Sequence, residues 1–144
     1  MRFITFAALS VLIPAVVALP ARGEDPLHVQ TLLLTGSCVG CDLTGADLTQ
    51  AHLIGADLRD ADLTDAILTE ANLEGADLEG AILTNANLTR AFLTNANLTN
   101  ANLSYANLTE AKVYFAEVSG AIFDTVDLTR AEIVGTPISV GGPE

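Results

Sequence analysis

The feature that most constrains the fold of this chain is a sequence repeat with a period of five residues. The segments 46–50, 71–75 and 96–100 have the sequences ADLTQ, ANLEG and ANLTN. With its degenerate ends, the array runs from residue 36 to residue 135 without an insertion, which makes twenty units. Repeats this short stack on their neighbours and do not fold alone, so the chain is expected to form a solenoid.

A period of five excludes a straight helix and a straight strand. Five helical residues rotate each successive Leu by about 140° around the axis, which spreads the Leu side chains over every face. In a strand, side chains alternate between faces, so an odd period sends successive Leu residues to opposite sides. The chain must therefore turn once per unit. The Leu and the Ala two positions before it then face one axis, and the Asp, Asn, Thr, Glu and Gly positions face outward.

The motif A-[DN]-L-x-x in unbroken tandem resembles the pentapeptide repeat family, over about 100 of the 144 residues. The resemblance implies an all-β fold, a right-handed quadrilateral parallel β-helix of about five coils. It implies four units per coil, and therefore 20 residues between stacked positions.

The charges provide an independent check of the coil length. The array contains four basic residues, and each has an acidic residue 20 positions away. Spacings of 15 and 25 pair fewer of them. The expected pairs are Arg59 with Glu79, Arg90 with Glu70 and Glu110, Lys112 with Glu132, and Arg130 with Glu110. Such exposed pairs are each worth less than about 1 kcal/mol, so they set register more than stability.

The N-terminus has the pattern of a secretory signal peptide over residues 1–23. A basic start at Arg2 precedes an apolar run over residues 3–19, and small residues follow. Cleavage near Gly23 is favoured, cleavage after Ala18 or Ala21 also fits, and an uncleaved anchor is the alternative. No later apolar run is long enough to span a membrane. The predicted location is the periplasm, the extracellular space or, by resemblance to cyanobacterial members of the family, the thylakoid lumen.

The two ends of the solenoid need covers. Residues 24–35 are expected to form a capping helix, with Asp25 as N-cap, Pro26 at the first helical position and an apolar stripe. The stripe consists of Leu27, Val29, Leu32 and Leu33. The C-terminal tail, residues 136–144, is too short and too rich in Gly and Pro for a second cap. That end could support an end-to-end homodimer, or it could fray under loose cover by the tail.

Cys38 and Cys41 occupy inward positions in the first turn of the array. One CxxC pair supplies too few ligands for zinc, and no thioredoxin-like unit surrounds it. In an exported protein an intramolecular disulfide fits, and so do two buried free thiols. Exported members of the family that this chain resembles often begin the array with such a pair.

The charge and the side chains exclude several function classes. A net charge of −12 argues against nucleic-acid binding, which depends on clustered Lys and Arg. His28 and His52 are expected at the surface without a nucleophile partner, so we expect no enzyme, no cofactor and no metal site. The stacked acids between Asp42 and Glu79 are interpreted as solvated, with divalent-cation binding as the alternative.

Apolar residues stand at outward positions where Asn, Thr or Gly are the rule. Scattered exposed hydrophobic residues are normal, but a cluster suggests a contact surface. The candidate partner-binding residues are Phe92, Tyr114, Phe115 and Val134. The predicted function is a non-enzymatic exported scaffold or protein-binding module whose partner is unknown. An acidic DNA mimic that inhibits a topoisomerase, as in some acidic family members, is the rival, and the predicted export argues against it.

Overall fold

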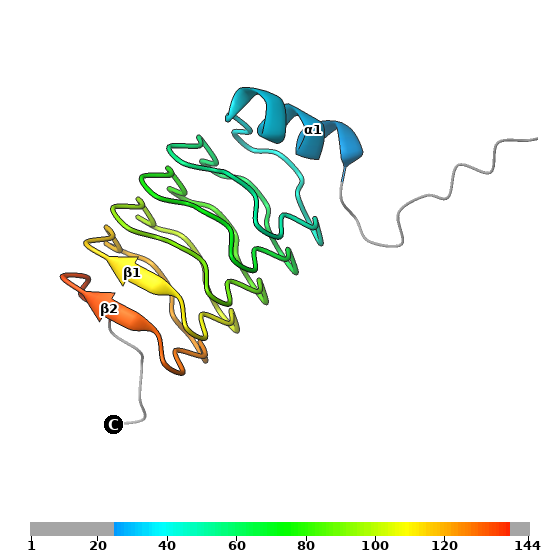
Figure 1. Cartoon of the computed structure of the whole chain (residues 1–144). Coiled ribbons are helices and arrows are strands. Elements are labelled where there is room, and N and C mark those ends of the chain that lie inside the picture. The colour runs from blue at the N-terminus through cyan, green and yellow to red at the C-terminus, as the bar shows by residue number, and fades with distance from the viewer. Residues whose placement is uncertain (1–24, 139–144) are drawn as a thin grey trace, which may run out of the picture.

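The structure is a computed structural model that describes residues 25–138, and the predicted signal peptide lies outside the described residues. The chain winds into a stack of similar coils, with one helix at the N-terminal end (Figure 1). Parallel bridges join each unit to the unit 20 residues later, as in Asp42 with Asp62 and Phe92 with Lys112. The architecture is therefore a parallel β-helix with four repeat units per coil, and the 20-residue register is confirmed.

Regular strands are nearly absent from the described part of this β-helix. Most units contribute a single bridged residue and then turn. Two short strands, β1 (Lys112–Tyr114) and β2 (Glu132–Val134), pair in parallel with Lys112 opposite Glu132. The expected β-structure consists of single parallel bridges between successive coils. Longer strands do not form, because the chain turns a corner every five residues.

Each corner is a tight turn with a left-handed residue at the last position of the repeat. The Ala that opens a unit donates its N–H to the carbonyl of the preceding Leu, as in Ala71 to Leu68 at 3.0 Å. The residue before that Ala has a positive φ, even where it is not Gly, as at Glu70 with φ 58°. The frequent Gly and Asn at this position therefore have a conformational reason.

The Asp or Asn at the second position of the repeat holds the turn that follows it. Its side-chain oxygen accepts the N–H two residues later, as in Asn107 with Thr109 at 2.9 Å. The hydroxyl of Thr can add a second bond, as in Thr89 to Asn87 at 2.6 Å. This local bonding explains why the second position selects Asp and Asn.

The interior consists of stacked Leu and Ala, as the repeat predicted. Leu48, Leu68, Leu88 and Leu108 form one column and are fully buried. Leu128, the last of that column, is only partly buried, because no further coil covers it.

Helix α1 (Pro26–Thr35) covers the N-terminal end of the stack. Asp25 caps it by accepting the N–H of Leu27, and Gly36 ends it with φ 72°. The expected apolar stripe is only partly correct. Leu32 is buried, but Leu27 and Leu33 are 66% and 55% exposed, because one side of a single helix faces the first coil. No helix in the described chain is long and apolar enough to cross a membrane.

His28 attaches this helix to the first coil. Its Nδ1 accepts the backbone N–H of Asp42 at 3.1 Å. His28 lies at the surface, as expected, with a side chain that is 38% exposed, and its bond to Asp42 gives it a structural role that the sequence did not predict. The neighbouring corner carries a disulfide between Cys38 and Cys41, and both residues are buried.

Three of the expected ion-pair assignments need correction, and the first is that Arg90 pairs with Glu70 and not with Glu110 among the described residues. Arg59 pairs with Asp57 at 2.7 Å and Asp77 at 3.7 Å, and no ion pair joins it to Glu79 among the described residues. The carboxylate of Asp57, two residues away in the same unit, accepts two hydrogen bonds from the guanidinium. Lys112 stacks on Glu132 in register but forms no ion pair with it in the described chain.

Candidate functional site

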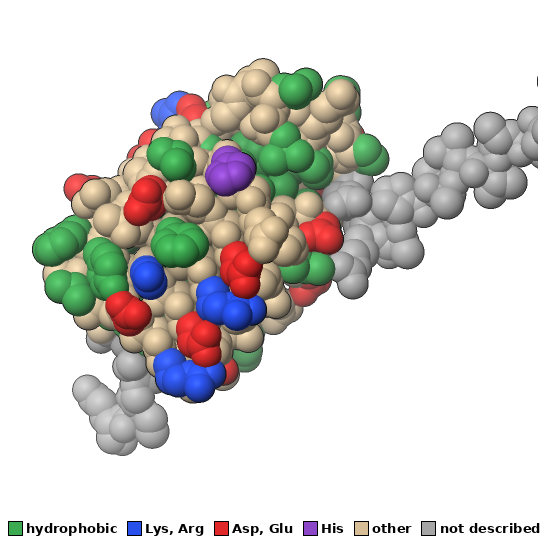
Figure 2. Space-filling model, in the orientation of Figure 1, with side chains coloured by type: hydrophobic (Ala, Val, Ile, Leu, Met, Phe, Trp, Pro, Cys, Tyr) green, Lys and Arg blue, Asp and Glu red, His purple; other side chains and the backbone are tan. Residues whose placement is uncertain are grey.

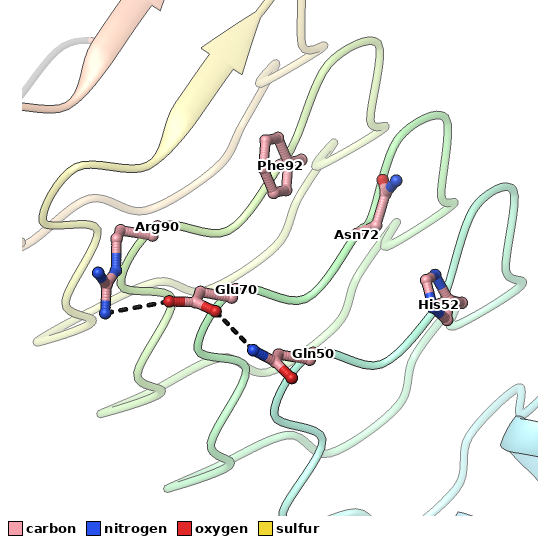
Figure 3. Close-up of a pocket in the computed structure, with 6 residues that line it drawn as sticks. All are labelled: Gln50, His52, Glu70, Asn72, Arg90 and Phe92. Carbon is pink, nitrogen blue, oxygen red and sulfur yellow. Dashed lines mark hydrogen bonds and ion pairs between the residues drawn. The ribbon is translucent and has the colours of Figure 1, made fainter.

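One face of the stack carries a shallow groove between two columns of side chains. Two hollows that share Arg90 and Phe92 make up this groove. We call the first wall the charged column, which consists of Gln50, Glu70, Arg90, Glu110 and Arg130. We call the second wall the mixed column, which consists of His52, Asn72, Phe92, Lys112 and Glu132. Figure 3 shows the N-terminal half of the groove, with side chains of both columns lining it.

The charged column is a ladder of paired side chains. Gln50 Nε2 donates to Glu70 at 2.7 Å, and the other oxygen of Glu70 lies 3.1 Å from Arg90 (Figure 3). Arg130 pairs with Glu110 in the same way two coils later. The expected pairs of Arg90 with Glu70 and of Arg130 with Glu110 are therefore confirmed. Both arginines of this wall are neutralised by a carboxylate.

The mixed column changes character along the stack, from polar His52 and Asn72 to aromatic Phe92 and cationic Lys112. The Nζ of Lys112 lies 5.4 Å from the centroid of the Phe92 ring, at a distance typical of a cation–π contact. The Tyr114 hydroxyl donates to the carboxylate of Glu132, and this bond raises the pKa of Tyr114. Lys112 therefore rests on an aromatic ring and has no carboxylate partner among the described residues.

The apolar patch, defined as Phe92, Tyr114, Phe115 and Val134, lies on the coils that form the C-terminal part of the groove, with Phe92 in the groove and Phe115 in a separate hollow beside Gly135. Tyr114 and Val134 are stacked partners in β1 and β2, and Phe92 is separated from them by Lys112. Phe115 is 61% exposed and Val134 is 53% exposed. Figure 2 shows hydrophobic side chains gathered on this face beside alternating basic and acidic side chains.

The ring of Phe115 lies against Gly135, which occupies the same corner of the next coil. A β-carbon built on Gly135 would lie 2.4 Å from Cδ1 of Phe115, so only glycine leaves room for the ring there. Phe115 itself has φ 54°, a left-handed conformation that is unfavourable for a bulky side chain. The ring therefore packs against Gly135 of the next coil on one side, and the residue is 61% exposed.

Sequence reasoning missed the contribution of Thr136, which it assigned to the loose tail. Thr136 is 8% exposed, and its Oγ1 accepts the N–H of Ala116 at 2.9 Å and donates to the carbonyl of Val113 at 3.1 Å. The hydroxyl thereby bridges a corner that other units close by a direct backbone bond. The signal was present, because Thr136 and Ile138 continue the Ala and Leu positions of the repeat.

The acidic columns are arranged as the register predicts, with Asp57 stacked under Asp77. The nearby Arg59 side chain lowers the pKa of Asp57, and the Thr44 hydrogen bonds lower that of Asp42. No three His, Cys, Asp or Glu side chains of the described residues gather into a metal-ligating group. The carboxylates hold turns or a guanidinium, so cation binding gains no support from a ligand set.

Several solved structures are similar to this chain. HetL, a pentapeptide repeat protein of the cyanobacterium Nostoc involved in heterocyst differentiation regulation, is 35% identical over 67% of this chain, with a TM-score of 0.43. The match covers 50% of HetL, so this chain spans half the length of that protein. A pentapeptide repeat protein of the Arabidopsis thaliana thylakoid lumen is 31% identical, over 81% of this chain and 70% of that one, with a TM-score of 0.41.

A third similar structure is the pentapeptide repeat protein Rfr23 of the cyanobacterium Cyanothece. It is 29% identical, over 76% of this chain and 92% of that one, with a TM-score of 0.38. No curated protein matches the sequence.

The family described as pentapeptide repeats matches residues 41–80 and 81–114, with eight copies. The matched residues make up more than half of the chain and coincide with the coils that carry most of the groove. The sequence repeat, the 20-residue register and this match agree, and the chain belongs to the pentapeptide repeat family.

Proposed function

We propose that this protein is a non-enzymatic, exported binding module that holds a protein partner on its groove face. The right-handed coil with a quadrilateral cross-section is part of the same proposal. The stack supplies a rigid support, and the apolar patch supplies the contact. The contact residues come from three successive coils, so the proposed binding surface extends along the axis of the stack.

Phe115 carries the proposal. The left-handed backbone is common to the last residue of most units, so what sets Phe115 apart is its exposed aromatic ring beside other apolar side chains. The equivalent positions of the two preceding coils are Asn95 and Gly75, which make the same corner without an exposed ring. Since the corner does not require Phe115, an intermolecular contact is the role that fits the ring.

The neighbours of Phe115 fit the same role. Val134 is exposed beside it, and Tyr114 and Phe92 add aromatic surface on the same face. Exposed aromatic residues are enriched among those that dominate protein–protein binding. The patch stands out against polar surroundings, because the outward positions of the earlier coils are mostly polar.

The test is a triple variant, Phe92→Asn, Tyr114→Thr and Phe115→Asn, which restores residues found at equivalent positions of other repeats. Quantitative crosslinking in the host should show one or more proteins captured by the natural chain and lost with the variant. The matched control is Tyr105→Asn, because Tyr105 is also an exposed aromatic at a left-handed position, with φ 60° and 57% exposure. Equal capture by the triple variant contradicts the proposal, and so does loss with the control.

Export is tested separately. Mass spectrometry of the protein from its host should find a mature N-terminus after Ala18, Ala21 or Gly23. An intact Met1 in a cytoplasmic fraction would contradict export. It would favour the alternative of an acidic DNA mimic, which the stacked carboxylates of Asp57 and Asp77 motivate. Inhibition of a purified topoisomerase by the protein would then decide between the two.

A further inference from the structure

Basic side chains are concentrated at the groove of this acidic protein. The described chain has four Lys or Arg residues, and Arg90, Lys112 and Arg130 all line the groove. The fourth, Arg59, lies outside it and pairs with Asp57 and Asp77. On a chain with a net charge of −12, the groove is therefore the place where an anionic group meets the least repulsion.

Lys112 is the cation that remains available in this groove. Carboxylates neutralise the other two, since Glu70 pairs with Arg90 and Glu110 with Arg130. Glu132, stacked on Lys112, accepts a hydrogen bond from the hydroxyl of Tyr114 and forms no ion pair with Lys112 in the described chain. The ammonium of Lys112 rests on the Phe92 ring, and that contact uses none of its three N–H donors in a hydrogen bond to an acceptor.

Apolar side chains follow Lys112 on the same face of the stack. Phe115 comes three residues after Lys112, Val134 comes two residues after Glu132, and both are more than half exposed. A ligand that places a carboxylate on Lys112 therefore brings its neighbouring groups against apolar surface. Partial exclusion of water there strengthens the charge-assisted hydrogen bond.

The surrounding acids select among anions. One unpaired cation matches one carboxylate, whereas a polyphosphate or a nucleic acid would bring further negative charge against Glu70, Glu110 and Glu132. Charge complementarity therefore favours a ligand with a single acidic group flanked by apolar ones. A short peptide segment has this chemistry.

We propose that the groove at Lys112 binds a peptide segment with an Asp or Glu side chain next to an apolar side chain. The carboxylate accepts hydrogen bonds from Lys112 Nζ, and the apolar side chain packs against Phe115 and Val134. This inference rests on the proposed function and names the chemistry of the protein partner.

The experiment uses two dye-labelled peptides with blocked ends, Gly-Phe-Asp-Leu-Gly and its uncharged match Gly-Phe-Asn-Leu-Gly. Binding to the protein purified from its host is measured by fluorescence anisotropy. The Asp peptide is expected to bind at least tenfold more tightly than the Asn peptide. Lys112→Gln should abolish that difference, and Lys112→Arg should retain it. Arg59→Gln is the matched control, because it removes a cation elsewhere and should leave both affinities unchanged.

Equal affinity of the two peptides, no binding of either, or an unchanged preference in Lys112→Gln overturns the inference. Tighter capture of a labelled oligonucleotide or of anionic vesicles through Lys112 also overturns the assignment to a peptide. Circular dichroism confirms that Lys112→Gln is folded. If the peptides fail while the triple variant still loses its host partner, the proposed function stands and only the partner chemistry falls. If the triple variant keeps its partner, the proposed function fails.

Discussion

The Oγ1 of Thr136 accepts a hydrogen bond at 2.9 Å from the backbone N–H of Ala116, twenty residues earlier in the chain. In most other units the corresponding Ala donates to the carbonyl of the Leu in the preceding unit. The corner before Ala116 follows β1 and lacks that direct bond, so the side chain of the next coil replaces it. The start of the C-terminal tail is therefore part of the fold.

Replacing Thr136 with Val keeps the shape of the side chain and removes the hydroxyl. The N–H of Ala116 is then left buried without a partner, which should cost about 1–3 kcal/mol of unfolding free energy. Urea denaturation measures the change. Thr136→Ser retains the hydroxyl and should recover most of the stability, whereas equal losses in both variants would mean that the methyl group is what matters.

The position of a Leu along the stack should decide how much it contributes. Leu88→Ala removes a fully buried side chain in the middle of a column and should cost about 2–5 kcal/mol. Leu128→Ala, at the last coil, should cost less, because that side chain is already partly in contact with solvent. Denaturation of both variants under the same conditions gives the comparison. A larger loss at Leu128 would indicate that the C-terminal end is covered, as in a dimer.

Acid should weaken the turns that Asp side chains hold. The hydroxyl and the N–H of Thr129 lower the pKa of Asp127 in the folded chain. A lowered folded pKa contributes stability that is present above the unfolded value of about 3.9 and is lost as the pH falls through the folded value.

The test compares the natural chain with Asp127→Asn, which keeps a side-chain acceptor for Thr129 and does not titrate. Between pH 5 and pH 2, the melting temperature of the natural chain should fall more than that of the variant. Parallel curves over this range would show that Asp127 contributes nothing through its charge.

The disulfide should be detectable in the protein from its host. Alkylation without reduction should leave Cys38 and Cys41 unmodified, and alkylation after reduction should modify both. Because the loop it closes is very short, the bond should add only about 2 kcal/mol, measured on a variant with both residues replaced by Ala. If Cys38 and Cys41 are alkylated in the unfolded chain without reduction, the two residues are free thiols instead.

The sequence by itself determined the solenoid and its interior. A five-residue period forces a corner in every unit, the resemblance to the pentapeptide repeat family implied a β-helix with 20 residues per coil, and the spacing of the charges supported that register. The interior column of Leu48, Leu68, Leu88 and Leu108 follows from the period and the register. Such a prediction succeeds because each unit contacts only its neighbours. The pattern within one repeat therefore also predicts how the repeats pack.

The sequence also marked the apolar patch, since Phe92, Tyr114, Phe115 and Val134 depart from the residues that the outward positions usually hold. It did not reveal that Lys112 forms no ion pair with a carboxylate among residues 25–138. Spacing alone paired Lys112 with Glu132, whereas that carboxylate accepts a bond from Tyr114 and the Lys112 ammonium lies over the Phe92 ring.

Only the tertiary structure decided these side-chain partners, together with Arg59 on Asp57, His28 on Asp42 and Thr136 on Ala116. In each case the register brings several donors and acceptors within reach of one another. Exposed pairs differ by less than about 1 kcal/mol, so their choice depends on rotamers and exact distances. The backbone repeat is encoded in every unit, and the function proposed for the groove depends on contacts that no single unit contains.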